Sequence, residues 1–233
     1  MTTNTHYRTS CLPLGMSYKH YLDFIMAEAN NLPFIERPDL SPYLVHLTKR
    51  TKEDGFSAYD NLISILMLGE IWGSNTRKGF VKGSEKASCF MDVPVASLKY
   101  ILKESNMNPE NPRYEPYGVL LTKKYAYTAG ARPVLYLSNN ELSALSIPEN
   151  EKWRVVRFDG VGAFDVNWLH EREWRCKGTF DLPKNPYAAL VHTVKEAREL
   201  IEHIQKHKKD FKSVPSSVLP IEVLCQGLPY AKR

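Results

Sequence analysis

Apolar residues near both ends of the chain recur with the spacing of an amphipathic helix. After Ser17, a residue type that caps helix N-termini, such a stripe extends to about Asn31. Gly69 follows a second helical pattern, where it suits a left-handed C-terminal cap. Thr193-x-x-Glu196 is a capping box that begins another helix. The pattern therefore predicts helices over residues 17–31, 59–68, 94–103 and 193–211.

Short apolar segments fill the middle of the chain and have the length and bounding residues of strands. Strands are expected over residues 44–47, 87–93, 117–122, 133–137, 153–158, 173–176, 188–191 and 221–225. Because helices cluster early and late while strands crowd the middle, the expected fold class is α+β, with a mixed or antiparallel central sheet flanked by helices. A single domain is expected over 1–233, with a helical extension at 1–40 and the last helix and strand within 185–233.

The composition is that of a globular chain. Its 233 residues are 43% hydrophobic and 24% charged, enough to bury one core. The four cysteines form no C-x-x-C pair, which argues against a zinc site or a disulfide framework and fits a reducing cytosol. No signal-like segment or membrane-length apolar run occurs, so a cytoplasmic protein without a membrane partner is expected. A net charge of +5 is compatible with a polyanionic partner but does not require one.

A histidine, an aromatic residue and two late carboxylates suggest a small-molecule site assembled from distant parts of one sheet. His46 and Phe90 lie in predicted strands, and Glu171 and Glu173 lie beside the start of a third. Residues two apart on a strand point to the same face, so both glutamates can reach one site. Each residue also has a purely structural interpretation. His46 and Phe90 are then core residues, and the glutamates form surface ion pairs with neighbouring arginines.

The order of these segments resembles ADP-ribosyltransferases of the DarT type. Leu-Val-His-Leu-Thr at 44–48, followed by Asn-Leu-x-Ser-Ile-Leu-x-x-Gly at 61–69, is similar to the strand and helix that open those proteins. Residues 89–100 resemble their aromatic strand and the helix after it. The resemblance covers about residues 43–176. Three segments also resemble abortive-infection proteins of the AbiGi type: 117–119, 132–136 and 171–175.

This resemblance implies a split sheet with NAD, a co-substrate, in the cleft between its halves. Glu173, ahead of Glu171, would be the catalytic carboxylate, because breaking the nicotinamide–ribose bond builds positive charge that a fixed carboxylate stabilises. Phe90 would stack on the nicotinamide, where the family more often has tyrosine. The residues implied to bind NAD are His46, Thr48, Phe90, Tyr100 and Arg50.

The resemblance also implies the toxin of a bacterial phage-defence toxin–antitoxin system, with a cognate antitoxin as its partner. Single-stranded RNA or DNA is the expected acceptor, because a basic loop precedes the Phe90 strand and aromatics such as Tyr114 and Tyr117 can stack an unpaired base. The expected acceptor-binding residues are Arg77, Lys78, Lys82 and Lys86. One alternative is a protein acceptor, since Glu-x-Glu pairs occur in arginine-modifying members of the superfamily. Another is a non-catalytic nucleotide-binding antitoxin or sensor with the same fold.

Other types of site lack their residue patterns. Neither the dinucleotide fingerprint nor the phosphate-loop pattern occurs, which argues against a Rossmann or P-loop enzyme. The absence of Gly-x-Ser-x-Gly leaves a hydrolase elbow unsupported. His203 and His207 lie one helical turn apart, but surrounding lysines favour a solvated helix face, so no metal is expected.

Overall fold

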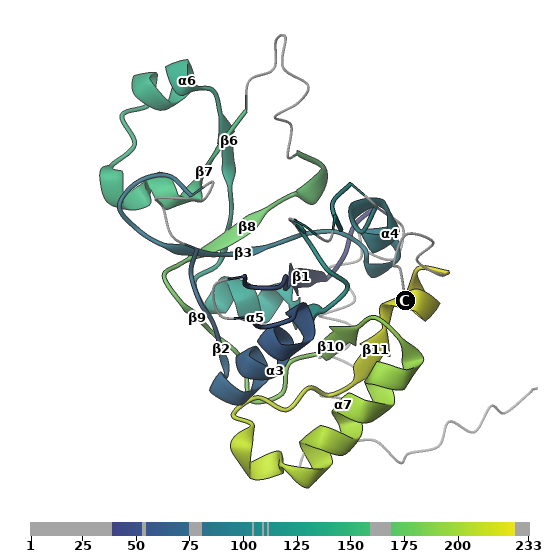
Figure 1. The fold of residues 1–233 in the computed structure, drawn as a ribbon. Coiled ribbons are helices and arrows are strands. Elements are labelled where there is room, and N and C mark those ends of the chain that lie inside the picture. Colours follow the sequence, from purple (N-terminus) through teal and green to yellow (C-terminus); the bar gives the residue numbers. More distant parts are fainter. Residues whose placement is uncertain are drawn as a thin grey trace, which may run out of the picture. The chain divides into compact units, whose positions relative to one another are not determined.

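A computed structural model describes residues 39–52, 55–74, 81–103, 105–108, 110, 112–158 and 169–226. The helix expected at 17–31 and the cations Arg77 and Lys78 lie outside these ranges. The chain divides into two compact units, 1–40 and 41–233. All helices and strands given below belong to the second unit (Figure 1).

A four-stranded mixed sheet has the most strands of the sheets in the described residues. Its order is β1-β4-β10-β11, with antiparallel pairing between the first three strands and parallel pairing at the end. All four residues of β10 are buried, as expected of a strand covered on both faces. The strands are β1 (Tyr43–Leu47), β4 (Gly118–Thr122), β10 (Ala188–Val191) and β11 (Val218–Pro220).

A second, three-stranded antiparallel sheet has the order β3-β8-β5. Its strands are β3 (Ala87–Phe90), β8 (Trp174–Lys177) and β5 (Arg132–Pro133). Two backbone hydrogen bonds join the sheets, because the N–H of Val45 donates to the Met91 carbonyl at 2.9 Å and the N–H of Met91 donates back at 2.8 Å. The chain thus holds two sheets that meet where β1 passes the end of β3.

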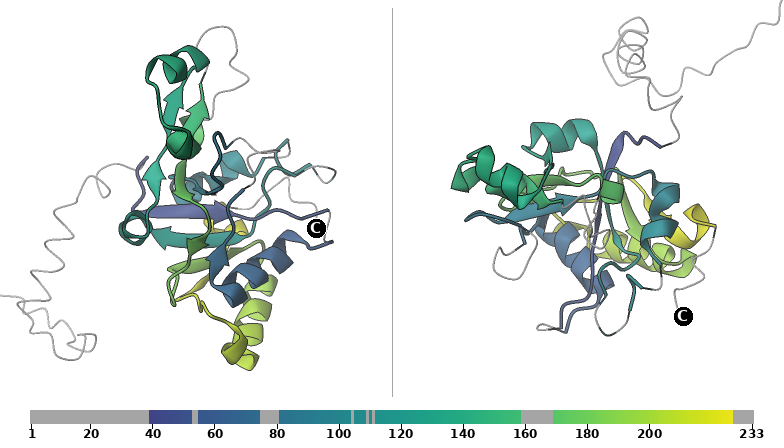
Figure 2. Two further views of the ribbon diagram at one scale, coloured as in Figure 1. Left: turned by 90° about the vertical axis from the view of Figure 1, so that its left-hand side faces the viewer. Right: turned by 90° about the horizontal axis from the view of Figure 1, so that it is seen from above.

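Two smaller ladders complete the strand pairing. β2 pairs antiparallel with β9, and β6 pairs parallel with β7. The β6–β7 ladder and helix α6 form an arm that projects from the two larger sheets (Figure 2). These elements are β2 (Glu70–Ile71), β9 (Phe180–Asp181), β6 (Leu135–Leu137), β7 (Val155–Arg157), α6 (Asn139–Ala144) and the 3-10 helix η2 (Glu149–Arg154) between α6 and β7.

The two long helices have the caps that the sequence predicts. Helix α3 (Ala58–Leu68) ends at Gly69, whose φ of 68° is left-handed, and α7 (Val194–Lys206) begins with the Thr193 capping box. The shorter helices are α4 (Leu98–Ile101), α5 (Lys123–Thr128) and α8 (Ile221–Leu224), with 3-10 turns η1 (Val95–Ser97), η4 (Leu169–Glu171) and η5 (Lys208–Asp210). In the described part of the chain, no helix has the length and apolar character needed to cross a bilayer.

The expected α+β class with open mixed and antiparallel sheets is confirmed, but the strand expected at 221–225 is wrong. Residues 218–220 form β11, and 221–224 turn into α8. Pro220 ends the ladder because the proline ring fixes φ and leaves no backbone N–H to donate. Pro220 is also the residue directly before the first residue of α8. The strand expected at 133–137 is also divided, into β5 and β6, with Val134 between them.

Candidate functional site

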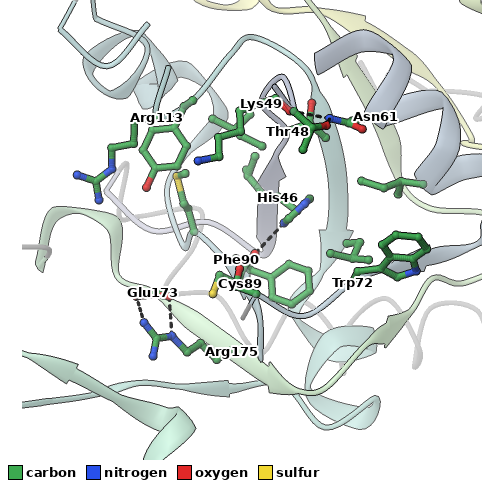
Figure 3. A pocket seen from close by; sticks show the side chains of 18 of the residues that line it. His46, Thr48, Lys49, Asn61, Trp72, Cys89, Phe90, Arg113, Glu173 and Arg175 are labelled. Atoms are coloured by element: carbon green, nitrogen blue, oxygen red, sulfur yellow. Dashed lines mark hydrogen bonds and ion pairs between the residues drawn. The ribbon is translucent and has the colours of Figure 1, made fainter. Parts of the chain in front are cut away.

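A cavity of about 840 Å³ lies where the two sheets meet, bounded by β1, β3, α3 and the segment that enters β8. Its volume falls within the range of roughly 300–1,000 Å³ that is usual for sites that bind small ligands. Figure 3 shows His46 near the centre, the Glu173–Arg175 pair on one side and Trp72 on the other. His46, Thr48, Phe90, Glu171 and Glu173, all predicted from the sequence, line this one cavity.

His46 is held on β1 as a neutral ring with one free nitrogen. Its Nδ1 lies 2.8 Å from the carbonyl oxygen of Cys89 on β3, and a carbonyl only accepts, so Nδ1 carries the proton. Burial lowers the pKa of His46, although the bond to Cys89 opposes this. Nε2 is therefore left as an acceptor within the cavity wall, suited to a ligand hydroxyl or amide N–H.

Glu173 is clamped by a buried arginine two residues further on. Arg175 is 1% exposed, and its Nε donates to Glu173 Oε1 at 2.7 Å while Nη2 donates to Oε2 at 3.2 Å. Arg175 Nη1 donates to the carbonyls of Trp153 at 2.9 Å and Val155 at 3.2 Å. Burial lowers the pKa of Arg175, but the negative charge of Glu173 and its hydrogen bonds act in the opposite direction, and the net pKa is raised. The carboxylate is thus fixed in position by a permanent cation.

Glu171 reaches the same cavity by a different route. It ends the 3-10 turn η4, and Arg172 has a left-handed φ of 44°, so β8 begins only at Trp174. Both glutamates line the cavity as expected, but the reason expected for this, alternation along a strand, is wrong. Glu171 Oε1 accepts from the Tyr114 hydroxyl at 2.7 Å and from Arg113 Nη2 at 3.2 Å. Burial and the Glu171 charge raise the pKa of Tyr114, so it donates as a neutral phenol.

The Cys89 side chain also lines the cavity, beside the Glu173–Arg175 pair. Burial and the negative charge of Glu173 raise the pKa of its thiol to about 12. A thiol with such a pKa is protonated at neutral pH and is a poor nucleophile. The reactive candidates in the cavity are therefore the carboxylates.

Phe90 and Thr48 mainly form part of the cavity wall and offer little to a ligand. Phe90 is 1% exposed and packs edge-on against Phe180, with ring centroids 4.8 Å apart. Only part of its ring meets the cavity, beside His46 at a centroid distance of 6.0 Å. The Thr48 hydroxyl donates to the Ala58 carbonyl at 2.8 Å, which ties β1 to the start of α3.

The remaining predicted residues lie elsewhere or outside the described ranges. Tyr100 is 70% exposed on α4, and Arg50 pairs with Glu115 at 2.6 Å; neither lines the cavity. Lys82 Nζ lies 3.1 Å from Asn139 Oδ1 at the projecting arm, and Lys86 is exposed before β3. Arg77 and Lys78 are not described, so their expected role stays a prediction.

The cavity face of α3 was not predicted from the sequence. Ala58, Leu62 and Leu66 are buried in the core, whereas a neighbouring face of the same helix lines the cavity. Asn61 on that face donates through Nδ2 to the Lys49 carbonyl at 2.7 Å and to Thr51 Oγ1 at 2.9 Å. A signal was present, because the cavity residues Asn61, Ser64, Ile65 and Leu68 recur at helical spacing.

Arg175 and Trp72 were also missed. Alternation along β8 would have placed Arg175 on the face of Glu173, but no local pattern shows that the pair is buried.

Comparisons of the chain with protein-family models, curated proteins and solved structures found no match. Among the described residues, no three His, Cys, Asp or Glu side chains form a group that could hold a metal ion.

Proposed function

We propose that this chain is an NAD-dependent mono-ADP-ribosyltransferase whose acceptor is single-stranded nucleic acid. The observation that carries the proposal is the joint lining of one cavity by His46 from the first sheet and by Glu171 and Glu173 beside the second. His46 lies more than a hundred positions before the two glutamates in the sequence. The volume of about 840 Å³ suits a dinucleotide-sized substrate.

Glu173 supplies the electrostatic part of the proposed chemistry. When the bond between nicotinamide and ribose breaks, its electron pair leaves with nicotinamide and the ribose ring gains positive charge. A carboxylate fixed before the reaction stabilises that charge without reorganising. Arg175 fixes Glu173 through two hydrogen bonds, and His46 Nε2 is available to accept a hydrogen bond from NAD.

Glu171 is the second carboxylate of this proposal. Its oxygen Oε1 is already bonded to Tyr114 and Arg113, which orients the group but also engages it. It is therefore suited to bind a ribose hydroxyl or to accept a proton from the acceptor, a contribution of roughly 10²–10⁴ in rate for general-base catalysis. Glu173 remains the favoured catalytic residue.

The resemblance to DarT-type and AbiGi-type proteins supports a role as the toxin of a phage-defence toxin–antitoxin system, with a cognate antitoxin protein. A protein acceptor remains the alternative within the enzyme class, because both glutamates of the Glu-x-Glu pair line the cavity. A non-catalytic nucleotide sensor is favoured by one observation: Phe90 is 1% exposed, so little of its ring is open to stack on nicotinamide.

Incubation of the full chain with labelled NAD and separate pools of RNA, DNA and lysate protein tests the proposal. We expect label in the single-stranded nucleic-acid pool, and a loss of about 100-fold or more in Glu173→Gln, because one preorganised electrostatic contact is removed. Glu149→Gln, at an exposed position on the arm, is the matched control and should transfer normally. NAD binding without transfer to any pool would support the sensor, and absence of NAD binding would refute both.

A further inference from the structure

Trp72 presents a bare aromatic face at the cavity. Its side chain is 70% exposed and lines the cavity, together with Phe56 at 47% and Leu68 at 40%. Water-exposed apolar groups are common singly, but a group of large ones at a cavity edge indicates a surface that binds something. Trp72 lies on the side of the cavity away from Glu173 and Arg175 (Figure 3).

The backbone that carries Trp72 is held firmly, so the exposure is not that of a loose loop. Ile71 pairs with Phe180 in the β2–β9 ladder, and the Ser88 hydroxyl lies 2.9 Å from both the Ile71 and the Gly178 carbonyl oxygens. Gly73 packs directly on the Gly178 carbonyl, where a Cβ would come within 2.5 Å of the oxygen. The indole is therefore held on a rigid support, which reduces the entropy lost when a ligand binds.

Two exposed lysines lie at or beside the cavity that Trp72 lines. Lys49 lines the cavity. Lys86 lies close to Gly73, the residue after Trp72, because a Cβ added to Gly73 would come within 3.0 Å of the Lys86 Cβ. Within the described residues, neither lysine forms a salt bridge with a carboxylate. Proteins bind unpaired bases on exposed aromatic faces and bind the phosphates of the same strand with cations nearby.

The tyrosines expected to stack a base have other partners. The Tyr114 hydroxyl donates to Glu171, and the Tyr117 hydroxyl donates to Glu196 at 2.7 Å. Both side chains are partly buried, and Tyr117 packs edge-on against Tyr59 at a centroid distance of 5.7 Å. The available platform at the cavity is Trp72 instead.

We infer that the Trp72 indole stacks an unpaired base of a single-stranded nucleic acid, whose neighbouring phosphates contact Lys49 and Lys86. This inference rests on the proposed function for the identity of the acceptor. The acceptor strand is favoured over the adenine of NAD because the indole faces solvent over most of its surface and both lysines are exposed. A nucleic-acid strand that approaches the cavity from solvent would contact the exposed Trp72 indole first.

Fluorescence anisotropy of the full chain with labelled 20-nucleotide single strands of DNA and RNA tests the inference. Trp72→Ala should weaken binding about 5- to 140-fold, the equivalent of the roughly 1–3 kcal/mol of one base–aromatic stack. Trp72→Phe should retain part of the affinity, because it keeps an aromatic face. Tyr127→Ala removes another exposed aromatic, on α5 and away from the cavity, and should bind as the wild type does.

Calorimetric titration of the same variants with NAD separates the two possible bases. Unchanged NAD affinity together with weakened strand binding supports the inference. Weakened NAD affinity with unchanged strand binding would assign the indole to adenine and overturn it, as would strand binding that is absent or indifferent to Trp72. If strand binding depends on Trp72 while the wild type cleaves no NAD, the inference stands and the transferase proposal fails.

Discussion

Replacing Arg175 with methionine removes the clamp on Glu173 while keeping a side chain of similar length. The guanidinium is 1% exposed and makes two hydrogen bonds to Glu173 and two to backbone carbonyls. Removing one partner of a buried ion pair costs about 3–5 kcal/mol, because the remaining charge is left unpaired. The orphaned carbonyls of Trp153 and Val155 add to this loss. We therefore expect Arg175→Met to lower the free energy of unfolding by at least about 3 kcal/mol.

Urea unfolding followed by circular dichroism measures this loss. With a slope of roughly 2 kcal/mol per molar urea, the midpoint should fall by about 1.5 M or more. Lys152→Met is the matched control, because Lys152 and Glu149 form an exposed pair that contributes less than about 1 kcal/mol. An equally small change in Arg175→Met would show that the clamp is not a buried pair.

The double variant Arg175→Met/Glu173→Gln tests whether the two side chains act together. Removing the carboxylate charge as well eliminates the unpaired buried ion, so the double variant should be more stable than Arg175→Met alone. The coupling free energy from this cycle should lie between about 0.5 and 3 kcal/mol, the range for residues in direct contact. Strict additivity of the two changes would contradict the assigned geometry.

Three further changes test other parts of the site. His46→Ala should weaken NAD binding in calorimetry. His46→Gln should flatten the pH dependence of urea unfolding. The folded-state pKa of His46 is lowered below about 6.5, so the stability of the wild type is complete above pH 6.5 and falls as the pH drops through the lowered pKa. Gly118→Ala should cost roughly 1–3 kcal/mol in urea unfolding and weaken NAD binding, because its Cβ would overlap the His46 carbonyl. Neutralising the predicted acceptor cations should flatten the salt dependence of single-strand binding by roughly 0.7 log units per lost contact, with NAD hydrolysis retained; these cations are Arg77, Lys78, Lys82 and Lys86.

Elements decided by neighbouring residues were predictable from the sequence. The caps at Gly69 and Thr193 depend on contacts within about four residues, and both appear where expected. The buried run at 188–191 likewise forms β10. The sheet order was not predictable, because β10 pairs with β4, some seventy positions earlier, and no local pattern specifies that partner. The short apolar run after Pro220 fits a strand or a helix equally well. It forms a helix because strand pairing ends at Pro220.

The site shows the same division between local and distant causes. Glu171 and Glu173 reach one cavity as expected, but through the left-handed turn at Arg172 instead of strand alternation. The arginine two residues after Glu173 was equally visible in the sequence. Its burial depends on the carbonyls of Trp153 and Val155, which a separate segment brings to its guanidinium.

Trp72 was not among the site residues predicted from the sequence. The large apolar surface of a tryptophan usually favours the core. Here Ile71 takes the buried position and pairs with Phe180, and the next side chain along the strand must point to the other face. That face is the cavity mouth beside α3, where Phe56 and Leu68 leave their own apolar surfaces uncovered. The exposure of Trp72 is thus a consequence of how β2 is paired.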